Sequence, residues 1–417
     1  MGAGHDVSIV IPVRENAELT RVCAESVFAR TDASVELLLV DNGSGPEVGE
    51  LAIELARRHA VRWIRNESNE GFGFACNQGM AAATADRVLL LNNDVVVTDG
   101  WYDRLSAALE SSPDVGMAGP RSNRVSGPQL IAGCSYRDDA GLGELARRVA
   151  TDAAGQVVDV ARLVGLCTLI RREVLDDVGG FDPCFWLGNF EDDDLSLRAL
   201  RKGWRLVIAA DAFIHHEGSA TFRRERFDWG ALMEENWDWF RAKYDYAGSM
   251  AEPYPARELA DQVSFDGARD FVPLTHERVF HPDADPMPLS VTRPRCALLF
   301  ADARHTAWLR VASEWLTAHV GDPDVALLLR AEPHFPETID RLQRHAERLA
   351  SSFGAADVPD VLFDSTPLAP RDRGGLYTAA TELLLAGGPR DALYRREAAA
   401  CALPAARYSS AKRSAPA

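Results

Sequence analysis

The stretch VSIVIPV at Val7–Val13 is a nearly unbroken apolar run, and the runs VELLLV at 35–40 and RVLLL at Arg87–Leu91 have the same character. Such runs are typical of strands that are buried on both faces of a parallel sheet. Strands that alternate with helices at this spacing predict βαβ units and a mostly parallel α/β sheet. The segments expected between these strands are helices at 19–29, 48–59 and 73–85 and a short strand at 61–65.

The rest of the chain predicts a second, smaller α/β part. Residues 251–292 are rich in proline and short of periodicity, which is typical of a linker. We therefore expect a catalytic domain over 1–250, this linker, and a small α/β domain over 293–417 whose tail is disordered from about 405. Little regular structure is expected over 130–160. Further elements are expected as strands at 297–300, 325–329 and 361–364 and helices at 172–178, 228–246, 305–320, 336–353 and 375–386.

Composition and charge exclude several classes of protein. The chain has 417 residues, 47% hydrophobic and 26% charged, as in a globular protein and unlike a disordered or fibrous one. Its formal net charge of −17 argues against nucleic acid or an anionic membrane surface as the main partner. The seven cysteines include no CxxC pair, which is typical of reduced cysteines. With no recognisable signal peptide or membrane span, we expect a cytoplasmic protein, attached at most peripherally to the inner face of a membrane.

Polar clusters follow directly after three of the predicted strands: Glu15-Asn16, Asp41 to Ser44, and Asn92 to Asp94. The carboxyl ends of parallel strands share one edge of a sheet, and ligands bind beyond that edge. In Asn92-x-Asp94, an amide and a carboxylate offer the oxygen ligands that Mg²⁺ or Mn²⁺ prefers. An Asx turn before a helix is the alternative reading of this cluster.

Further motifs extend this pattern over residues 6–222. They are VSIVIP at 7–12, VDNGS at 40–44, NEGFG at 69–73 with Asn77-x-Gly79, LNND at 91–94, GFD at 180–182, FEDDDLSLR at 190–198 and His216-x-Gly218. In this order and spacing they resemble the motifs of family 2 glycosyltransferases. The similarity is greatest to the bacterial branch that includes rhamnosyltransferases of surface-polysaccharide assembly.

The resemblance implies a GT-A fold, a nucleotide-sugar donor, a divalent cation and sugar transfer with inversion at the anomeric carbon. It implies that Asp41 hydrogen-bonds the nucleobase and that Asp94 is a metal ligand. Asn92 stands where the family has its first acidic residue, which leaves one carboxylate for the metal. The other residues implied for binding the donor are Pro12, Val13, Glu15, Asn69, Gly71, Asn77, Asn92 and Asn93.

The acidic run Glu191-Asp192-Asp193-Asp194 is the candidate catalytic centre. Four adjacent carboxylates repel one another, so at least one should have a raised pKa unless a cation lies nearby. Inverting transfer needs a carboxylate that takes the proton of the acceptor. The resemblance implies Asp192 as this base, with Glu191 as the second choice. Capping of a helix that starts here is the structural alternative.

Three groups around this run complete the candidate site. Trp186, Gly188 and Asn189 would form part of a sugar-binding wall, although Trp186 could equally belong to the core. His215 and His216 should point to opposite faces of a strand, and the resemblance assigns His216, followed by Gly218 and Thr221, to the metal or diphosphate. The basic cluster 223–226, with Arg223 first, would neutralise the departing diphosphate; a solvated surface is the alternative.

The end of the chain resembles a degenerate donor domain of the GT-B type. The resemblance lies in Leu376-Tyr377-x-Ala379-Ala380 and in REAAACALP at 396–404. Pro389 stands about where that family has a glutamate, and Ala402 stands where it has a glycine. We therefore expect a domain kept for scaffolding, acceptor binding or assembly.

The function expected is transfer of a sugar from a UDP-, dTDP- or GDP-linked donor to a glycan, lipid-linked or small-molecule acceptor. A peptide-modifying transferase of the same fold and a non-catalytic nucleotide-sugar-binding scaffold are the alternatives, and a homodimer remains open. A sugar-1-phosphate nucleotidyltransferase is disfavoured, because Pro12 to Asn16 is not a glycine-rich phosphate loop.

Overall fold

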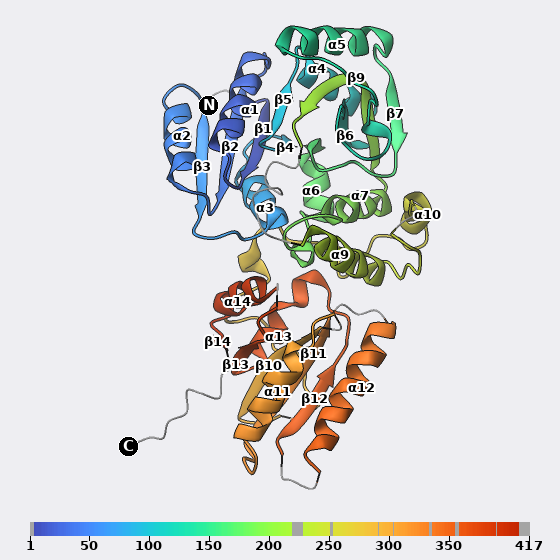
Figure 1. Ribbon diagram of the computed structural model, residues 1–417. Helices are drawn as coiled ribbons and strands as arrows, with labels where there is room; N and C mark the ends of the chain where they lie inside the picture. The colour runs from blue at the N-terminus through green and yellow to red at the C-terminus, as the bar shows by residue number, and fades with distance from the viewer. Residues whose placement is uncertain are drawn as a thin grey trace. The chain divides into compact units, whose positions relative to one another are not determined.

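The computed structural model describes residues 4–218, 228–250, 253–290, 292–302, 304–332, 336–354, 358–388 and 390–407. The chain divides into two compact units, shown in Figure 1. The first unit contains residues 1–236 and 250–274, and the second contains 237–249 and 275–417. No helix among the described residues is long and apolar enough to cross a membrane.

The first unit is built on a sheet of nine strands from the described residues, in the order β3-β2-β1-β4-β8-β6-β9-β5, with β7 beside β9. The strands β3, β2, β1 and β4 are parallel, as the buried apolar runs predict. Beyond β4 the sheet is mixed, because β8 runs antiparallel to both β4 and β6. The bounds are β1 Val7–Val13, β2 Val35–Asn42, β3 Val61–Asn66, β4 Arg87–Leu91, β5 Val95–Val97, β6 Val115–Ser122, β7 Val157–Val160, β8 Cys167–Arg171 and β9 Arg205–His216.

Helices α1 to α7 lie between these strands along the chain. Helices α9 and α10 follow the last strand, and α9 passes from the first unit into the second after residue 236. The largest core of the unit joins inward side chains of β1, β2, β4 and β9 with α1, α2 and α4. The bounds are α1 Ala17–Ala29, α2 Pro46–Ala56, α3 Phe72–Ala82, α4 Trp101–Leu109, α5 Asp139–Asp152, α6 Arg172–Val178, α7 Glu191–Lys202, α9 Trp229–Lys243 and α10 Ala256–Asp261.

The described residues of the second unit form a five-stranded parallel sheet in the order β12-β11-β10-β13-β14. Its core packs Trp308, Val311 and Trp315 of α11 against β10 and β11, with Leu342 of α12 beside them. The bounds are β10 Arg295–Asp302, α11 Ala307–Ala318, β11 Val325–Glu332, α12 Pro336–Ser352, β12 Asp360–Asp364, α13 Gly374–Thr378, β13 Glu382–Leu385, α14 Asp391–Ala400 and β14 Ala405–Arg407.

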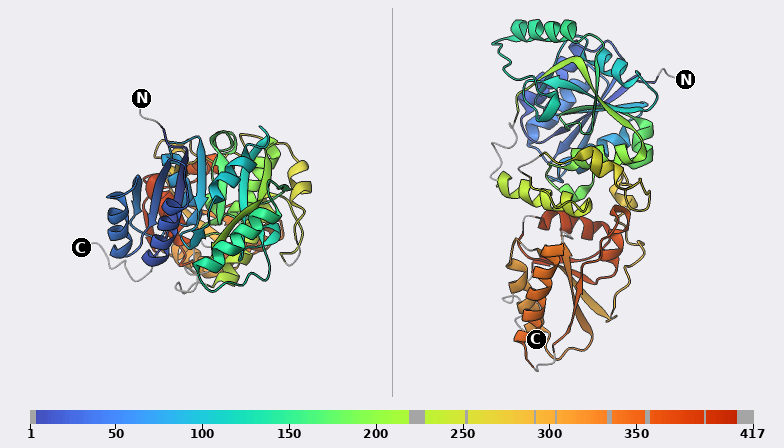
Figure 2. Two further views of the ribbon diagram at one scale, coloured as in Figure 1. Left: turned by 90° about the horizontal axis from the view of Figure 1, so that it is seen from above. Right: turned by 90° about the vertical axis from the view of Figure 1, so that its right-hand side faces the viewer.

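Two segments differ from the expectation. Residues 130–160 contain α5 and β7, and Leu142 and Ala146 of α5 bury themselves against Phe213 of β9; Figure 2 shows this helix along one margin of the unit. The expected helix 375–386 is the short α13 followed by the buried strand β13. Leu383 and Leu384 pair there with β10, so tertiary burial overrides the local helical composition.

The expected linker 251–292 contains α10, and its residues belong to the first unit up to 274 and to the second unit from 275. Residues 405–407 form β14 beside β13 rather than beginning the tail, and 408–417 lie outside the described residues.

Candidate active site

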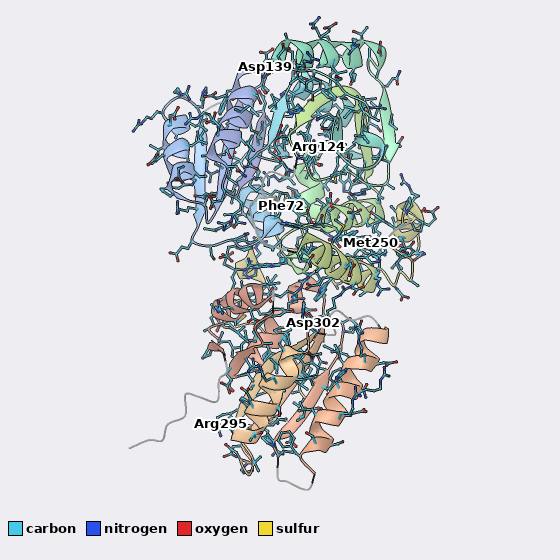
Figure 3. All side chains as sticks on the ribbon, in the orientation of Figure 1. Phe72, Arg124, Asp139, Met250, Arg295 and Asp302 are labelled. Atoms are coloured by element: carbon cyan, nitrogen blue, oxygen red, sulfur yellow. The ribbon has the colours of Figure 1, made fainter. Side chains whose placement is uncertain are left out.

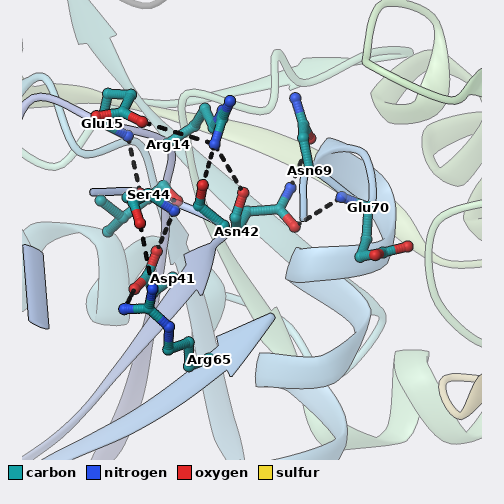
Figure 4. Close-up of polar contacts among 10 residues, drawn as sticks. Arg14, Glu15, Asp41, Asn42, Ser44, Arg65, Asn69 and Glu70 are labelled. Atoms are coloured by element: carbon teal, nitrogen blue, oxygen red, sulfur yellow. Dashed lines mark hydrogen bonds and ion pairs between the residues drawn. The ribbon is translucent and has the colours of Figure 1, made fainter. Parts of the chain in front are cut away.

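The nucleotide side of the predicted site is a hydrogen-bonded network at the ends of β1 and β2 (Figure 4). Asp41 is fully buried, and its carboxylate accepts hydrogen bonds from Ser44 N at 2.8 Å and from Arg65 Nη1 at 3.2 Å. The parallel pairing of the strands places Val13 opposite Asp41, with Pro12 one step before it. The structure therefore brings these predicted residues to one edge of the sheet.

The turn after β1 carries local backbone strain. Glu15 and Asn16 both have left-handed backbone conformations, with φ of 58° and 59°. Glu15 N donates to Ser44 Oγ at 2.9 Å, and Arg14 donates to the carbonyl of Gly43 (Figure 4). Non-glycine residues rarely adopt positive φ, and such strain concentrates at functional sites.

Asn42 joins β2 to the loop that carries Asn69 and Gly71. Its Nδ2 donates to Asn69 Oδ1 at 3.0 Å and to the Gly71 carbonyl at 3.1 Å, and its Oδ1 accepts from Glu70 N at 2.9 Å. Gly71 has φ of 93°, and a Cβ there would lie 2.4 Å from the carbonyl oxygen of Trp186. Only glycine fits this contact, so the loop is held against the segment that contains Trp186.

Asn77 of α3 is buried, and both polar atoms of its side chain are engaged with Phe181. Its Nδ2 donates to the Phe181 carbonyl and its Oδ1 accepts from Phe181 N, each at 2.8 Å. The neighbouring Gly180 has no room for a Cβ, which would lie 2.2 Å from Asn77 Oδ1. These contacts indicate that Asn77 positions the loop at Gly180 and Phe181, rather than binding the nucleotide directly as predicted.

The segment after β4 brings Asp94 to the end of β9. Val95 of β5 pairs antiparallel with His216, and His216 Nε2 lies 3.2 Å from Asp94 Oδ1. Burial lowers the pKa of His216, but the hydrogen bond and the charge of Asp94 outweigh it and leave the pKa raised. The two predicted metal ligands are therefore neighbours.

His215 and His216 have different partners, as expected for adjacent residues of one strand. His215 Nδ1 hydrogen-bonds the hydroxyl of Tyr136, whereas His216 Nδ1 lies 2.7 Å from the carbonyl oxygen of Arg124. Arg124 also donates to the carbonyl of Glu217. Thr221, Arg223 and the rest of the basic cluster lie outside the described residues.

A two-residue segment before β8 connects the end of β4 with the start of α7. Asn92 N donates to the Leu166 carbonyl at 2.9 Å, and Gly165 N donates to Asp192 Oδ2 at 2.9 Å. Asn92 Oδ1 is buried and has no hydrogen-bond partner among the described residues. Asn93 points into the unit, where its Nδ2 donates to Thr20 Oγ1 at 2.9 Å. The structure thus joins the predicted metal motif to the predicted base.

The four acids at the start of α7 have different surroundings. Asp194 forms a fully buried ion pair with Arg198, with 2.8 Å between Oδ2 and Nε. Asp193 Oδ1 lies 2.7 Å from Arg162 Nε and accepts from the Tyr254 hydroxyl. All four acids lie in the first turn of α7, as the structural alternative expects, and Asp192 Oδ1 accepts from Asp193 N at 3.0 Å. The N-cap residue itself, Phe190, makes no side-chain cap hydrogen bond.

Glu191 and Asp193 have raised pKa values, as expected for crowded carboxylates. Burial raises the pKa of Glu191 well above its usual range, and repulsion from Asp192 adds to the effect. Burial also raises the pKa of Asp193 to about 8, again with repulsion from Asp192, while Arg162 opposes the shift. Glu191 Oε2 is buried without a hydrogen-bond partner among the described residues, and Asp192 is only half-buried. Asp192 is thus the more exposed of the two candidate acids.

The loop before α7 has an unusual backbone conformation, and the side-chain amide of Asn236 hydrogen-bonds to it. Trp186, Asn189 and Phe190 all have positive φ, at 48°, 75° and 72°. The fully buried Asn236 of α9 donates to the carbonyls of Phe185 and Gly188, each at 2.7 Å. Trp186 is itself mostly buried, 7% exposed. The loop is therefore held in one conformation from the side of α9.

Sequence reasoning missed several residues that build this site: Asn42, Arg124, Arg162, Asn236 and Tyr254. Asn42 lay inside a recognised motif and could have been found as a buried amide beside Asp41. Arg162, Asn236 and Tyr254 reach the acidic run from distant parts of the chain. No local pattern marks such partners.

The model of the family described as "Glycosyltransferase like family 2" matches residues 5–242. The chain therefore belongs to this family, and its first unit is a glycosyltransferase domain of the GT-A class. The fold class and the family expected from the motifs are confirmed. The match ends at residue 242, so the resemblance of residues 376–404 to a GT-B domain stays a prediction.

Named relatives agree with this membership. The chain is 29% identical over 254 residues to the pre-mycofactocin glycosyltransferase of Mycobacterium tuberculosis, which covers 60% of this chain and 48% of that protein. It is 30% identical over 264 residues to the N-acetylglucosaminyl-diphospho-decaprenol L-rhamnosyltransferase of the same organism, covering 54% of this chain and 84% of the relative. The chain thus spans less than half the length of the first of these relatives.

A solved structure with some likeness is the mannosyltransferase PcManGT from Pyrobaculum calidifontis in complex with GDP-Man and Mn²⁺. It has a TM-score of 0.39 and 18% identity, and the match covers 58% of this chain and 62% of that one.

Proposed function

We propose that the first unit transfers a sugar from a nucleoside-diphosphate donor to an acceptor hydroxyl, with inversion at the anomeric carbon. One observation carries the proposal. The Gly165–Leu166 segment accepts a hydrogen bond from Asn92 and donates one to Asp192, which joins the end of β4 to the start of α7. A donor bound at the ends of β1, β2 and β4 would then have its sugar beside Asp192, the carboxylate proposed to take the proton of the acceptor.

The nucleotide would lie on the network at the ends of β1 and β2. Asp41 would accept a hydrogen bond from the base, and its burial beside Arg65 fixes the orientation of its carboxylate. The strained turn at Glu15 and the close packing at Gly71 would shape the nucleoside pocket. The other donor residues we propose are Pro12, Val13, Asn69 and Asn92. Asn77 and the inward-pointing Asn93 would have positioning roles.

Asp94 and His216 would hold the divalent cation. A carboxylate and an imidazole 3.2 Å apart, with the unpartnered amide oxygen of Asn92 on the same segment, fit a Mg²⁺ or Mn²⁺ ion. No group of three or more His, Cys, Asp and Glu side chains in the described part of the chain could hold an ion alone. The oxygens of the donor diphosphate would complete the shell, and the cation would supply charge stabilisation for the leaving group.

The residues that we propose for the chemical step lie at the start of α7. Asp192 would take the proton of the acceptor hydroxyl as its oxygen attacks the anomeric carbon opposite the leaving diphosphate. Glu191, with its buried unpartnered oxygen, would hydrogen-bond a sugar hydroxyl. Arg223 would stabilise the leaving diphosphate.

The names of the relatives guide the choice of substrates. One relative is named an N-acetylglucosaminyl-diphospho-decaprenol L-rhamnosyltransferase and another a pre-mycofactocin glycosyltransferase. We therefore propose a lipid-linked glycan as the first acceptor to test and a natural product as the second.

Release of nucleoside diphosphate tests this proposal. We expect one of dTDP-rhamnose, UDP-glucose and GDP-mannose to release its nucleotide with Mn²⁺, and faster when an N-acetylglucosaminyl diphospholipid or another glycan acceptor is added. The matched control is Asp192→Asn, which should bind the donor and release none. Two results would contradict the proposal: release of nucleotide by Asp192→Asn at the wild-type rate, or no release by the wild type from any of the three donors.

A further inference from the structure

Arg162 is a partly exposed arginine beside the acidic run at the start of α7. Its Nε lies 2.7 Å from Asp193 Oδ1, and its Nη2 donates to Ser126 Oγ at 3.2 Å. Its side chain is 34% exposed, and its charge also acts on Asp192 and Glu191. Arg162 is therefore close enough to Asp192 to influence the charge of that carboxyl group.

The segment that carries Arg162 is bonded directly to α7. Leu163 N donates to Ser196 Oγ in the second turn of the helix at 3.3 Å, and Gly165 N donates to Asp192 Oδ2 at 2.9 Å. Leu163 and Ser196 are both buried. These hydrogen bonds hold the backbone next to Arg162 at a fixed place beside the acidic run.

The loop after β6 connects Arg162 with the proposed metal ligand His216. Asn123 Oδ1 accepts from His216 N at 2.8 Å. The carbonyl oxygen of Arg124, a residue that Figure 3 labels, lies 2.7 Å from His216 Nδ1. Ser126, two residues further on, accepts from Arg162. Arg162 therefore contacts both the acidic run and the loop that holds the proposed metal ligand.

The titratable groups that interact with Asp192 are Glu191 and Asp193 in α7, Tyr254 before α10, and Arg162 before β8. Burial raises the pKa of Asp193 to about 8, and it also raises the pKa values of Glu191 and Tyr254. Below about pH 8 the Asp193 carboxyl is therefore mostly protonated and does not cancel the charge of Arg162. The guanidinium group stays charged throughout this range.

We propose that Arg162 is a positioning residue of the transfer step, whose positive charge keeps Asp192 ionised and so able to take the proton of the acceptor. An opposite charge nearby favours the ionised form of a carboxyl group, whereas crowding with other carboxyl groups opposes it. This role rests on the proposed function, because it needs Asp192 to be the base. The effect of the charge itself can be measured without turnover.

Four variants separate the charge of Arg162 from its shape. Arg162→Gln removes the charge and can still donate to Ser126, whereas Arg162→Lys keeps the charge. Ser126 is exposed, so Ser126→Asp should fold normally while it places a negative charge beside Arg162. Ser126→Asn, which is neutral and of similar size, is the matched control.

Carboxyl ¹³C NMR of the full chain, labelled at aspartate, tests the inference, with the Asp192 signal assigned by its loss in Asp192→Asn. We expect Arg162→Gln to raise the titration midpoint of this signal by about one pH unit. This is the lower end of the usual effect of a close opposite charge, because solvent screens a partly exposed arginine. Ser126→Asp should raise the midpoint by less, and Arg162→Lys and Ser126→Asn should stay near the wild type.

The pH profile of nucleotide release should change in the same way, measured with whichever of dTDP-rhamnose, UDP-glucose and GDP-mannose is active. Without the charge of Arg162, the base stays protonated up to a higher pH. On the acid limb, kcat/KM of Arg162→Gln should therefore fall about tenfold, which corresponds to one pH unit, and it should approach the wild-type value as the pH rises.

An unchanged midpoint in both Arg162→Gln and Ser126→Asp would overturn the inference, as would a midpoint raised as far by Arg162→Lys as by Arg162→Gln. A fall in kcat that is equal at every pH would leave Arg162 with a structural role alone. A shifted midpoint with an unmoved pH profile would show that Asp192 is not the group that titrates in the transfer. If the wild type releases no nucleotide from any donor, the proposed function fails, and the NMR midpoint still decides whether Arg162 controls the charge of Asp192.

Discussion

Asp192 is the residue on which the proposed chemistry depends. It is half-buried at the start of α7, with one carboxylate oxygen bonded to Gly165 N and the other to Asp193 N. Asn is isosteric but has a single acceptor oxygen, so Asp192→Asn keeps one of these two hydrogen bonds and should preserve the local fold. We expect kcat to fall by about 10²–10⁴, the usual contribution of a general base. The affinity for donor nucleotide should stay close to that of the wild type.

Steady-state kinetics, with calorimetry for the nucleotide, measures this effect. Asp152→Asn, a change of the same kind at an exposed position of α5, is the control. A kcat for Asp192→Asn within a few-fold of the control would show that another group takes the proton.

Asp193 should make the stability of the protein depend on pH. Burial raises its pKa in the folded chain to about 8, whereas an unfolded Asp titrates near about 4. Between these values the folded state binds more protons than the unfolded state, so stability falls as pH rises through this window and levels off above it. Asp193→Asn removes this group and should flatten the dependence.

Thermal unfolding from pH 5 to pH 8 measures this slope. The midpoint of the wild type should drop more over this range than that of Asp193→Asn, and Asp152→Asn should follow the wild type. Equal slopes for all three proteins would mean that Asp193 titrates at its ordinary pKa when folded.

At the scale of elements, a buried ion pair fixes α7 to the rest of its unit. Arg198 is fully buried, pairs with Asp194 and donates at 2.6 Å to the Val178 carbonyl at the end of α6. Arg198→Met should destabilise the protein by about 3–5 kcal/mol, because it leaves the Asp194 charge buried without its partner. The double change Arg198→Met with Asp194→Leu should recover much of this loss.

Urea unfolding measures both variants. If the single change cost no more than an exposed substitution, the pair would have no structural role. If the double variant were less stable than the single one, the loss would come from packing or from the carbonyl partners of Arg198.

The contact from α9 to the loop before α7 should matter for turnover more than for nucleotide affinity. Asn236 satisfies the carbonyls of Phe185 and Gly188 in the loop that packs on Gly71. In Asn236→Ala, we expect a loss of about 1–3 kcal/mol in stability from the unpaired carbonyls, and a fall in kcat with little change in nucleotide affinity. An unchanged kcat in the folded variant would show that Asn236 stabilises the fold and has no effect on turnover.

The elements that the sequence predicted are those with a strong local signal. Buried apolar runs such as Val7–Val13 are strands, and Arg172–Val178 is a helix with the expected bounds. Segments whose structure depends on distant partners were not predicted. The helix α5 is polar on most of its surface and buries only a narrow face against β9, and β13 becomes a strand because β10 lies beside it.

The same distinction holds for the site. Asp94 and His216 were recognisable from motifs, and the β5–β9 pairing brings them together. Arg162 and Tyr254 come from other parts of the chain, and only the fold shows that both contact Asp193.

At the scale of the whole molecule, the charge opposes the proposed ligand. A chain with a net charge of −17 repels a nucleoside diphosphate, so local cations must offset the field. The described residues place Arg14 and Arg65 at the nucleotide network and Arg124 beside His216. A divalent cation at Asp94 would add to them, so we expect nucleotide binding to depend on the metal.

Calorimetric titration of UDP, dTDP and GDP, each with and without Mn²⁺, measures this dependence. We predict that one nucleotide binds the wild type and Asp192→Asn alike when Mn²⁺ is present, and that its affinity falls at least about tenfold, about 1.4 kcal/mol, without Mn²⁺ or in Asp94→Ala. Binding of no nucleotide, or binding that neither Mn²⁺ nor Asp94→Ala changes, would contradict the proposed donor site.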